Sequence, residues 1–427
     1  MLREAHAHIV QHGRAMGMLR LDDCLDRDDC LQRVAMAAAS AHDTPPTNWL
    51  LGVGVRAQAW PDPTYPTLDE LDSILGPRPC CLWSFDHHAL VANSAALAAT
   101  GVRPGDPDPP NGRFVRAPGG RFTGLALEAA AKQVYSAVPE PEGAERLEVV
   151  RRALDDLARH GFEEVHDLLS QPWLGPTLAA LHDAGELRAR VWLYPPIDTL
   201  EAVARTRREW ERPGVRLAGG KLFADGTLNS RTAWMLHPYA DPIPDMPRGQ
   251  CMADAGTIQR ALERAHGLGL GLAVHAIGDA AVRACLDAFE SSHATGRPAT
   301  EPSLPAMRIE HAELIDAADV PRFARLGVVA SVQPCHLLYD IEALERGLPD
   351  RLDRVLPLWE LVDSGCVPGE GLWFGSDTPI VRPDPADSVQ AAVRRGRAGG
   401  PRIGAGQAIT EAEAWAAFGR RESSRGA

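Results

Sequence analysis

The chain has 427 residues, of which 45% are hydrophobic, so it can bury a large core and exceeds the roughly 250 residues of one parallel barrel. Its 44 basic and 57 acidic residues give a formal net charge of -13, which disfavours nucleic-acid phosphates and anionic membrane surfaces as partners. We therefore expect a small-molecule substrate, no nucleic acid and no membrane, and association into a homo-oligomer stays open.

Cysteine usage and the N-terminus indicate the compartment. The eight cysteines show no CxxC spacing, and we interpret them as reduced thiols. The N-terminus lacks a basic segment followed by an apolar one, and no apolar run reaches the roughly 18 residues of a membrane helix. These features predict a cytoplasmic protein.

Short runs rich in β-forming residues are followed along the chain by helical patterns. Strand followed by helix, repeated, implies a parallel sheet, and eight strands are what a closed parallel barrel requires. The sequence therefore predicts an α/β fold, a (β/α)8 TIM-like barrel with a large insertion after its first strand. The predicted strands are Leu2 to His8, Glu163 to Asp167, Ala189 to Tyr194, Val215 to Phe223, Leu270 to His275, Met307 to His311, Val328 to Gln333 and Leu372 to Asp377. The predicted helices include Thr257 to His266, Ala280 to Ser291, Ala317 to Leu326 and Leu356 to Ser364.

The interval from Ile9 to about Leu147 does not follow this alternation of strand and helix. It carries its own strand candidates, Leu50 to Val55 and Cys80 to Phe85, and a stretch rich in proline and glycine at 104–120. We therefore predict residues 1–8 as the first barrel strand, 9–147 as an insertion subdomain, and 148–427 as the remainder of the barrel.

Candidate metal ligands stand at the ends of five predicted strands. Parallel barrel strands deliver their C-terminal residues to one mouth, so residues far apart in sequence can meet there. Residues two apart on a strand share a face, so His6 and His8 can bind one ion, with Glu4 beneath them. A lone HxH is weak evidence, and a single histidine is as often a core residue. The six candidates are His6, His8, Lys221, His275, His311 and Asp377.

Lys221 and Asp377 each allow two interpretations. An inward lysine is costly as an ammonium, so Lys221 is either paired with Asp225 or Asp377 or carbamylated to bridge two metals. Beside the other candidates we favour the carbamate. Asp377 could cap the turn that follows it, or could ligate a metal and take the proton from the bound water.

Other polar and aromatic residues are candidates for the pocket or for packing. Arg308 and Glu310 have opposite parity to His311, so we expect them to face the helices and pair there. Each pocket candidate, taken singly, is more often structural. The substrate-binding candidates are Trp60, His87, His88, Asp225 and Trp234.

With these residues assembled, the chain resembles family 3 of the amidohydrolase superfamily, the branch that includes N-substituted formamide deformylases. The resemblance covers nearly the whole chain, but we expect the family's usual N- and C-terminal β-sandwich segments to be lacking. The family's Asp two residues before the first histidine is Glu4 here. The matching segments begin at His6, Asp86, Thr123, Lys221, His275, Arg308, Ser331 and Gly375.

The resemblance implies a ligand set and a reaction. His6, His8 and Asp377 would hold one metal, His275 and His311 the other, and a carbamylated Lys221 would lie between them. One or two divalent ions are expected, with zinc favoured by the family and compatible with these ligands. The implied activity is a hydrolase that cleaves a non-peptide C–N bond, of an amide or a formamide, in a small molecule with a metal-activated hydroxide, using Asp377 and Lys221 as catalytic residues.

Two alternatives stay open. A deaminase of the same superfamily shares the HxH and the late Asp, but it typically has a Glu shortly after the fifth-strand histidine and lacks the bridging lysine. Here Gly278 and Asp279 follow His275, which disfavours deamination. The chain could also be a catalytically silent, truncated barrel with a binding role.

Overall fold

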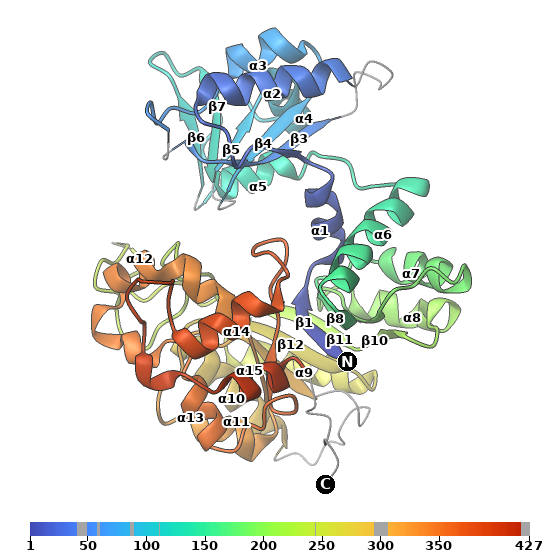
Figure 1. The fold of residues 1–427 in the computed structure, drawn as a ribbon, viewed down its shortest axis with the longest axis vertical. Coiled ribbons are helices and arrows are strands. Elements are labelled where there is room, and N and C mark those ends of the chain that lie inside the picture. Colours follow the sequence, from blue (N-terminus) through green and yellow to red (C-terminus); the bar gives the residue numbers. More distant parts are fainter. Residues whose placement is uncertain are drawn as a thin grey trace. The chain divides into compact units, whose positions relative to one another are not determined.

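The chain folds into two compact units in the computed structural model, which describes residues 1–40, 49–57, 60–85, 89–110, 112–243, 245–293 and 306–419 (Figure 1). Unit 1 comprises Met1–Gly13 and Arg146–Ala427, and unit 2 comprises Arg14–Glu145. Among the described residues, no helix combines the length and the hydrophobicity needed to span a membrane. All eight cysteines are free thiols.

Unit 1 contains two sheets in which every pairing between strands is parallel. This confirms the predicted α/β fold with parallel strands. The strands fall on the eight predicted runs, except that the fourth run is divided at Ala218. The first sheet is β1 (Leu2–Ala7), β8 (Phe162–Leu168), β9 (Arg190–Tyr194) and β10 (Val215–Leu217). The second is β11 (Gly219–Phe223), β12 (Gly271–Ala276), β13 (Met307–His311), β14 (Val329–Val332) and β15 (Leu372–Phe374).

Backbone contacts link the edges of these two sheets. A parallel bridge joins Ala7 to Thr378, and the Asp377 amide donates to the His6 carbonyl over 2.7 Å. A second parallel bridge joins Pro196 to Lys221. The strand order and these links are consistent with a TIM-like barrel.

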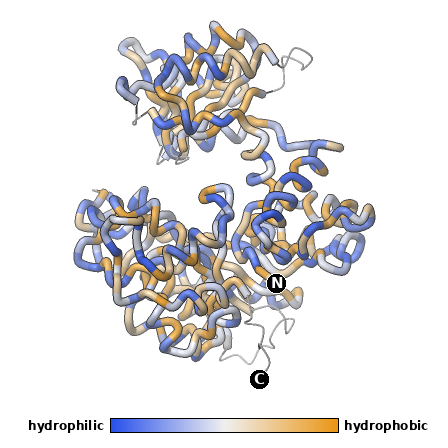
Figure 2. Tube along the Cα trace, viewed as in Figure 1, coloured by the Kyte–Doolittle hydropathy of each residue, from blue (hydrophilic) through white to orange (hydrophobic). Residues whose placement is uncertain are grey.

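Helices follow the strands of unit 1, and each buries one side. In α6 the buried residues are Val149, Val150, Ala153, Leu154 and Leu157, which recur at helical spacing. Figure 2 shows hydrophilic and hydrophobic residues alternating along such helices. The helices are α6 (Ala144–Arg159), α7 (Leu174–Asp183), α8 (Leu200–Trp210), α9 (Ala255–Gly267), α10 (Asp279–His293), α11 (Val320–Leu326), α12 (Leu337–Gly347), α13 (Leu358–Asp363), α14 (Pro385–Arg394) and α15 (Glu411–Ala417), with 3-10 turns η2 (Pro334–His336), η3 (Pro349–Arg354) and η4 (Ala405–Gln407). The first helix of the chain, α1 (Ile9–Met16), runs across the boundary of the two units.

Unit 2 is a mixed sheet with both faces covered. Alternate residues of β4 belong to different apolar clusters, Cys81 and Trp83 to one and Cys80 and Leu82 to the other. The strand order is β2-β3-β4-β5-β7-β6. Its elements are β2 (Leu19–Arg20), α2 (Arg27–Ser40), β3 (Leu50–Val55), α3 (Leu68–Leu75), β4 (Cys80–Ser84), β5 (Ala89–Ala92), α4 (Ser94–Thr100), β6 (Gly112–Arg116), β7 (Phe122–Glu128) and α5 (Ala129–Tyr135).

Replacing Gly375 by Ala tests how closely the chain after β15 must approach β1. A Cβ at Gly375 would lie 2.5 Å from the His6 amide nitrogen and 2.7 Å from Glu4 Oε1, so the two segments would have to separate. We expect Gly375→Ala to destabilise unit 1 by about 1–3 kcal/mol, the usual cost of overpacking. Urea unfolding followed by circular dichroism measures this.

Gly267→Ala is the matched control, because a Cβ there meets nothing within 4 Å. It should leave the midpoint of unfolding unchanged or raise it, since alanine is the better helix former. Equal midpoints for the two variants would contradict the close approach.

Candidate metal site

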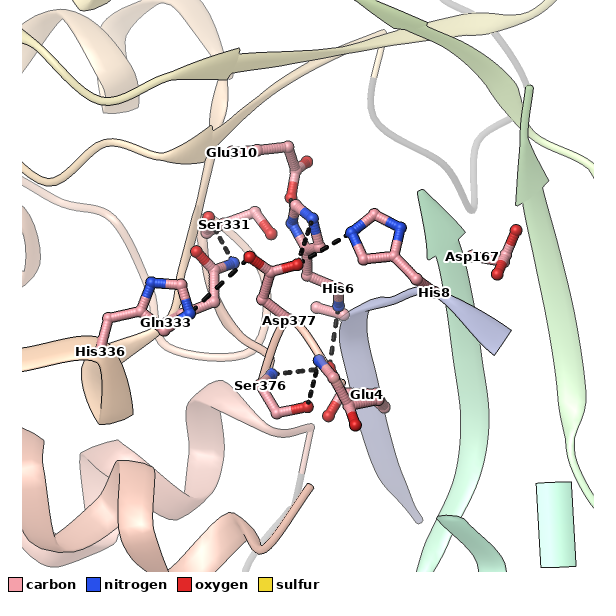
Figure 3. Close-up of polar contacts among 12 residues, drawn as sticks. Glu4, His6, His8, Asp167, Glu310, Ser331, Gln333, His336, Ser376 and Asp377 are labelled. Carbon is pink, nitrogen blue, oxygen red and sulfur yellow. Dashed lines mark hydrogen bonds and ion pairs between the residues drawn. The ribbon is translucent and has the colours of Figure 1, made fainter. Parts of the chain in front are cut away.

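Asp377 and three predicted histidines converge where the strands of unit 1 end. Asp377 Oδ1 lies 2.9 Å from His8 Nε2 and 3.4 Å from His6 Nε2. His6, His311 and Asp377 each offer a ligand atom, and these atoms all lie within 4.8 Å of one another. Figure 3 shows the Asp377 carboxylate between His8 and His336. Asp377 therefore points into the cluster and does not act as a cap.

The hydrogen bonds of the histidines leave one ring nitrogen facing the cluster. His6 Nδ1 lies 2.7 Å from Glu310 Oε2, and a carboxylate only accepts, so His6 donates through Nδ1 and keeps a lone pair on Nε2. His275 Nε2 donates to the Gly226 carbonyl over 3.0 Å, which leaves the lone pair on Nδ1. The His275 and His311 rings meet at 4.4 Å between centroids.

The electrostatics favour neutral imidazoles beside an ionised carboxylate. Burial lowers the pKa of His6 to about 4 and that of His275 to about 3, and it lowers the pKa of His311 well below its usual value. Burial alone would raise the pKa of Asp377, but His6 and His8 more than offset it and hold that pKa well below its usual value. Neutral imidazole and carboxylate are the forms that bind metal ions.

Lys221 is buried in the same region, and its Nζ has no hydrogen-bond partner among the described residues. Within the described residues, Lys221 therefore forms neither of the ion pairs, with Asp225 or with Asp377, that the sequence allowed. Burial lowers the pKa of Lys221 to about 8. Lys221 Nζ lies over the Phe223 ring, 5.2 Å from its centroid.

Arg308 and Glu310 pair with each other as predicted, but their other partners come from neighbouring strands of unit 1, so the prediction that they face the helices is wrong. Glu310 contacts His6, and Arg308 bonds Glu310, the Ser331 hydroxyl at 2.7 Å and His166 Nδ1 at 2.8 Å. Strand alternation holds through Glu310 but fails at His311, whose φ of 70° leaves the extended region. His311 therefore turns to the same side as Glu310.

Two residues of the cluster, Glu313 and His336, were missed by the sequence analysis. His336 Nδ1 lies 3.4 Å from Glu313 Oε1, and His336 Nε2 lies 3.7 Å from Asp377 Oδ2. Burial alone would lower the pKa of His336, but Glu313 and Asp377 more than offset it and raise that pKa to about 9. Both residues lie just beyond predicted strand ends, which is the signal that could have found them.

Asp225, predicted to bind substrate, is held mainly by the backbone, and its Oδ1 also lies 3.6 Å from His275 Nε2. Its carboxylate accepts from the amides of Trp234 at 2.8 Å, Ile277 at 3.0 Å and Gly278 at 2.8 Å. Burial raises the pKa of Asp225 to about 7. The carboxylate thus ties the chain after β11 to the turn after β12, which is a structural role.

The remaining substrate-binding candidates gain no support from their placement. Trp234 is half-buried and packs against the core of unit 1. Trp60 is buried in a core of unit 2, and its Nε1 donates to the Cys24 carbonyl over 3.0 Å. His87 and His88 lie outside the described residues.

Known proteins resemble this chain in both sequence and fold. The YtcJ protein of Bacillus subtilis, named as an amidohydrolase, is 30% identical over 406 residues, covering 92% of this chain and 72% of its own. The N-substituted formamide deformylase of Arthrobacter pascens is 26% identical over 392 residues, covering 87% and 68%. A solved metal-dependent hydrolase from Pyrococcus furiosus, itself uncharacterized, superposes with a TM-score of 0.76 at 26% identity, covering 97% of this chain and 79% of that one.

A family model describes almost the entire sequence. The amidohydrolase family model matches residues 2–424, which takes in every residue of the cluster around Asp377. Its range also spans unit 2 without a break. The chain belongs to the amidohydrolase family.

Proposed function

We propose that this chain is a metal-dependent hydrolase that cleaves a non-peptide C–N bond, of an amide or a formamide, in a small molecule. One observation carries the proposal: four imidazoles, a carboxylate and a buried amine converge from the ends of separate parallel strands. Family membership supports hydrolysis, and the relative named as a formamide deformylase supports the bond type.

The residues fit a pair of cations. His6, His8 and Asp377 would hold one ion, and His275 and His311 would hold the other through the nitrogens that face the cluster. These nitrogen and oxygen ligands suit zinc. Lys221 Nζ, buried without a hydrogen-bond partner among the described residues, is the orphaned polar atom that most needs an explanation.

A carbamate on Lys221 supplies that explanation. The neutral amine would add to CO2, forming an N–C bond and releasing one proton, and the resulting carboxylate would lie between the two ions. Only two of the 44 basic residues, Lys132 and Lys221, are lysines. An amine can lose its proton and react, whereas a guanidinium cannot, so a lysine at this position has a chemical use that arginine lacks.

The cluster also supports a hydrolytic mechanism. A divalent ion bound here would polarise the substrate carbonyl and lower the pKa of water. Asp377, held ionised by its histidine neighbours, would accept a proton from the attacking water and pass it to the leaving nitrogen. Glu310 would hold His6 in the tautomer that keeps Nε2 free.

We also propose that the two parallel sheets of unit 1 close into one eight-stranded barrel, with β10 and β11 as two halves of its fourth strand. The bridges from Ala7 to Thr378 and from Pro196 to Lys221 support closure at both junctions. Unit 2 would then be the insertion that follows the first strand.

Lys221→Ala should lower kcat/KM on N-formyl and N-acyl amines by at least about 100-fold, because the groups that stabilise transition-state charge would be lost. A short carboxylate such as formate should restore part of the activity by occupying the vacated space. Hydrolysis is measured by the amine released. Full activity in Lys221→Ala would contradict the proposal.

The carbamate itself is tested by native mass spectrometry of protein held in bicarbonate. The wild-type chain and Lys132→Ala should carry a mass increase equal to one CO2, and Lys221→Ala should lack it. Lys132 is a clean control because it is the chain's other lysine. The same increase in Lys221→Ala would rule out this position.

Glu310→Gln should weaken zinc binding by about 10-fold. This is the lower end of the range expected when a metal-binding histidine loses its carboxylate hydrogen-bond partner. The physical reason is that an amide is a weaker acceptor for the His6 Nδ1 hydrogen. Competition with a chromophoric chelator gives the affinity. Glu345→Gln is the control, because Glu345 is exposed, and equal affinities for both variants would remove Glu310 from the site.

A further inference from the structure

We propose that His311, Glu313 and His336 form an additional cation position beside the one at His6, His8 and Asp377. His311 and Glu313 are buried, the His336 side chain is 11% exposed, and each residue offers a ligand atom within 4.8 Å of the other two. The position would take a divalent ion that accepts nitrogen and carboxylate oxygen, such as zinc. The inference rests on the proposed function in one respect: it takes the group of His6, His8 and Asp377 as the first cation position.

Two neighbouring parallel strands bring these side chains together. His311 ends β13, and the turn formed by His311 and Ala312, with φ of 70° and 43°, returns Glu313 toward the cluster. The Leu356 amide donates to the Glu313 carbonyl over 2.6 Å and holds that turn. His336 is the last residue of η2, which follows β14.

His336 lies between two carboxylates. Its Nδ1 is 3.4 Å from Glu313 Oε1, and its Nε2 is 3.7 Å from Asp377 Oδ2. Each ring nitrogen of His336 thus faces a carboxylate oxygen, and Nε2 has no hydrogen-bond partner among the described residues. A divalent ion bound here would displace the ring proton of His336 and take its place between the imidazole and the Glu313 carboxylate.

The hydrogen bond between His336 Nδ1 and Glu313 Oε1 is long, and its length also matches the separation of two ligands on one ion. A charge-assisted N–H···O bond measures about 2.7–2.9 Å, which is shorter than the 3.4 Å between His336 Nδ1 and Glu313 Oε1. Two ligands at about 2.0–2.1 Å from one tetrahedral zinc lie about 3.4 Å apart. Independently, His311 Nδ1 is buried without a hydrogen-bond partner among the described residues. His311 would hold this ion through one ring nitrogen and the ion shared with His275 through the other, as an imidazolate that has released its ring proton to solvent.

The test counts zinc ions per chain by equilibrium dialysis and elemental analysis of the full-length protein. Glu313→Gln and His336→Asn should each bind one ion fewer than the wild type, and Lys221→Ala should keep that ion. Asp156→Asn is the matched control, because Asp156 Oδ2 pairs with the buried His12 at 2.9 Å outside the cluster. It should bind as many ions as the wild type.

Three results would overturn the inference. An unchanged ion count in Glu313→Gln and His336→Asn would mean that the pair is an imidazolium salt bridge, and it would leave the proposed function intact. An equal loss in Asp156→Asn would assign the effect to general disturbance of the fold. No zinc in any protein, the wild type included, would overturn the proposed function as well.

Anomalous scattering from zinc-loaded wild-type crystals gives a readout that needs no variant. A peak between His311, Glu313 and His336 is expected. The absence of a peak there, with peaks elsewhere in the cluster, would overturn the additional position alone.

Discussion

The candidate site depends on holding the first strand beside the last. His6 and His8 come from β1, whereas Asp377 follows β15, so the cluster exists only where these segments touch. The backbone makes that contact through the Asp377 amide and the His6 carbonyl. Glu4 adds to it by accepting from the amides of His6 at 3.0 Å and Ser376 at 2.9 Å.

The same region carries an unusual density of buried charge, and most of it is balanced. Glu310 is paired with Arg308, so two charges that would each be costly alone are buried together. His6, His275 and His311 avoid the cost by staying neutral. Lys221 is the exception, since no described residue pairs with it. A buried amine of this kind indicates a chemical role and not a contribution to the stability of the fold.

Strand positions and strand ends were predictable from the sequence. Apolar runs fix where parallel strands lie, and the residues that follow them share one end of the sheet. That reasoning located His6, His8, Lys221, His275 and Asp377 in chain order. Family resemblance added which of these residues could share an ion.

Side-chain direction at strand ends was not predictable, because it depends on backbone angles that alternation does not describe. The left-handed turn places His311 on the same side as Glu310, so counting alternate residues back from His311 gave the wrong side for Arg308 and Glu310. Glu313 and His336 lie past the strands, where periodicity gives no information. Trp60 was a candidate for the pocket because it is aromatic, but it lies in an apolar core of unit 2. That core forms by tertiary packing, which the sequence pattern does not show.

X-ray absorption at the zinc edge of the purified, zinc-loaded protein tests the central claim most directly. The account predicts a shell of nitrogen and oxygen ligands with imidazole scattering, and a second metal at about 3.5–4 Å. Sulfur ligands at about 2.3 Å, or a protein that retains no zinc, would contradict it.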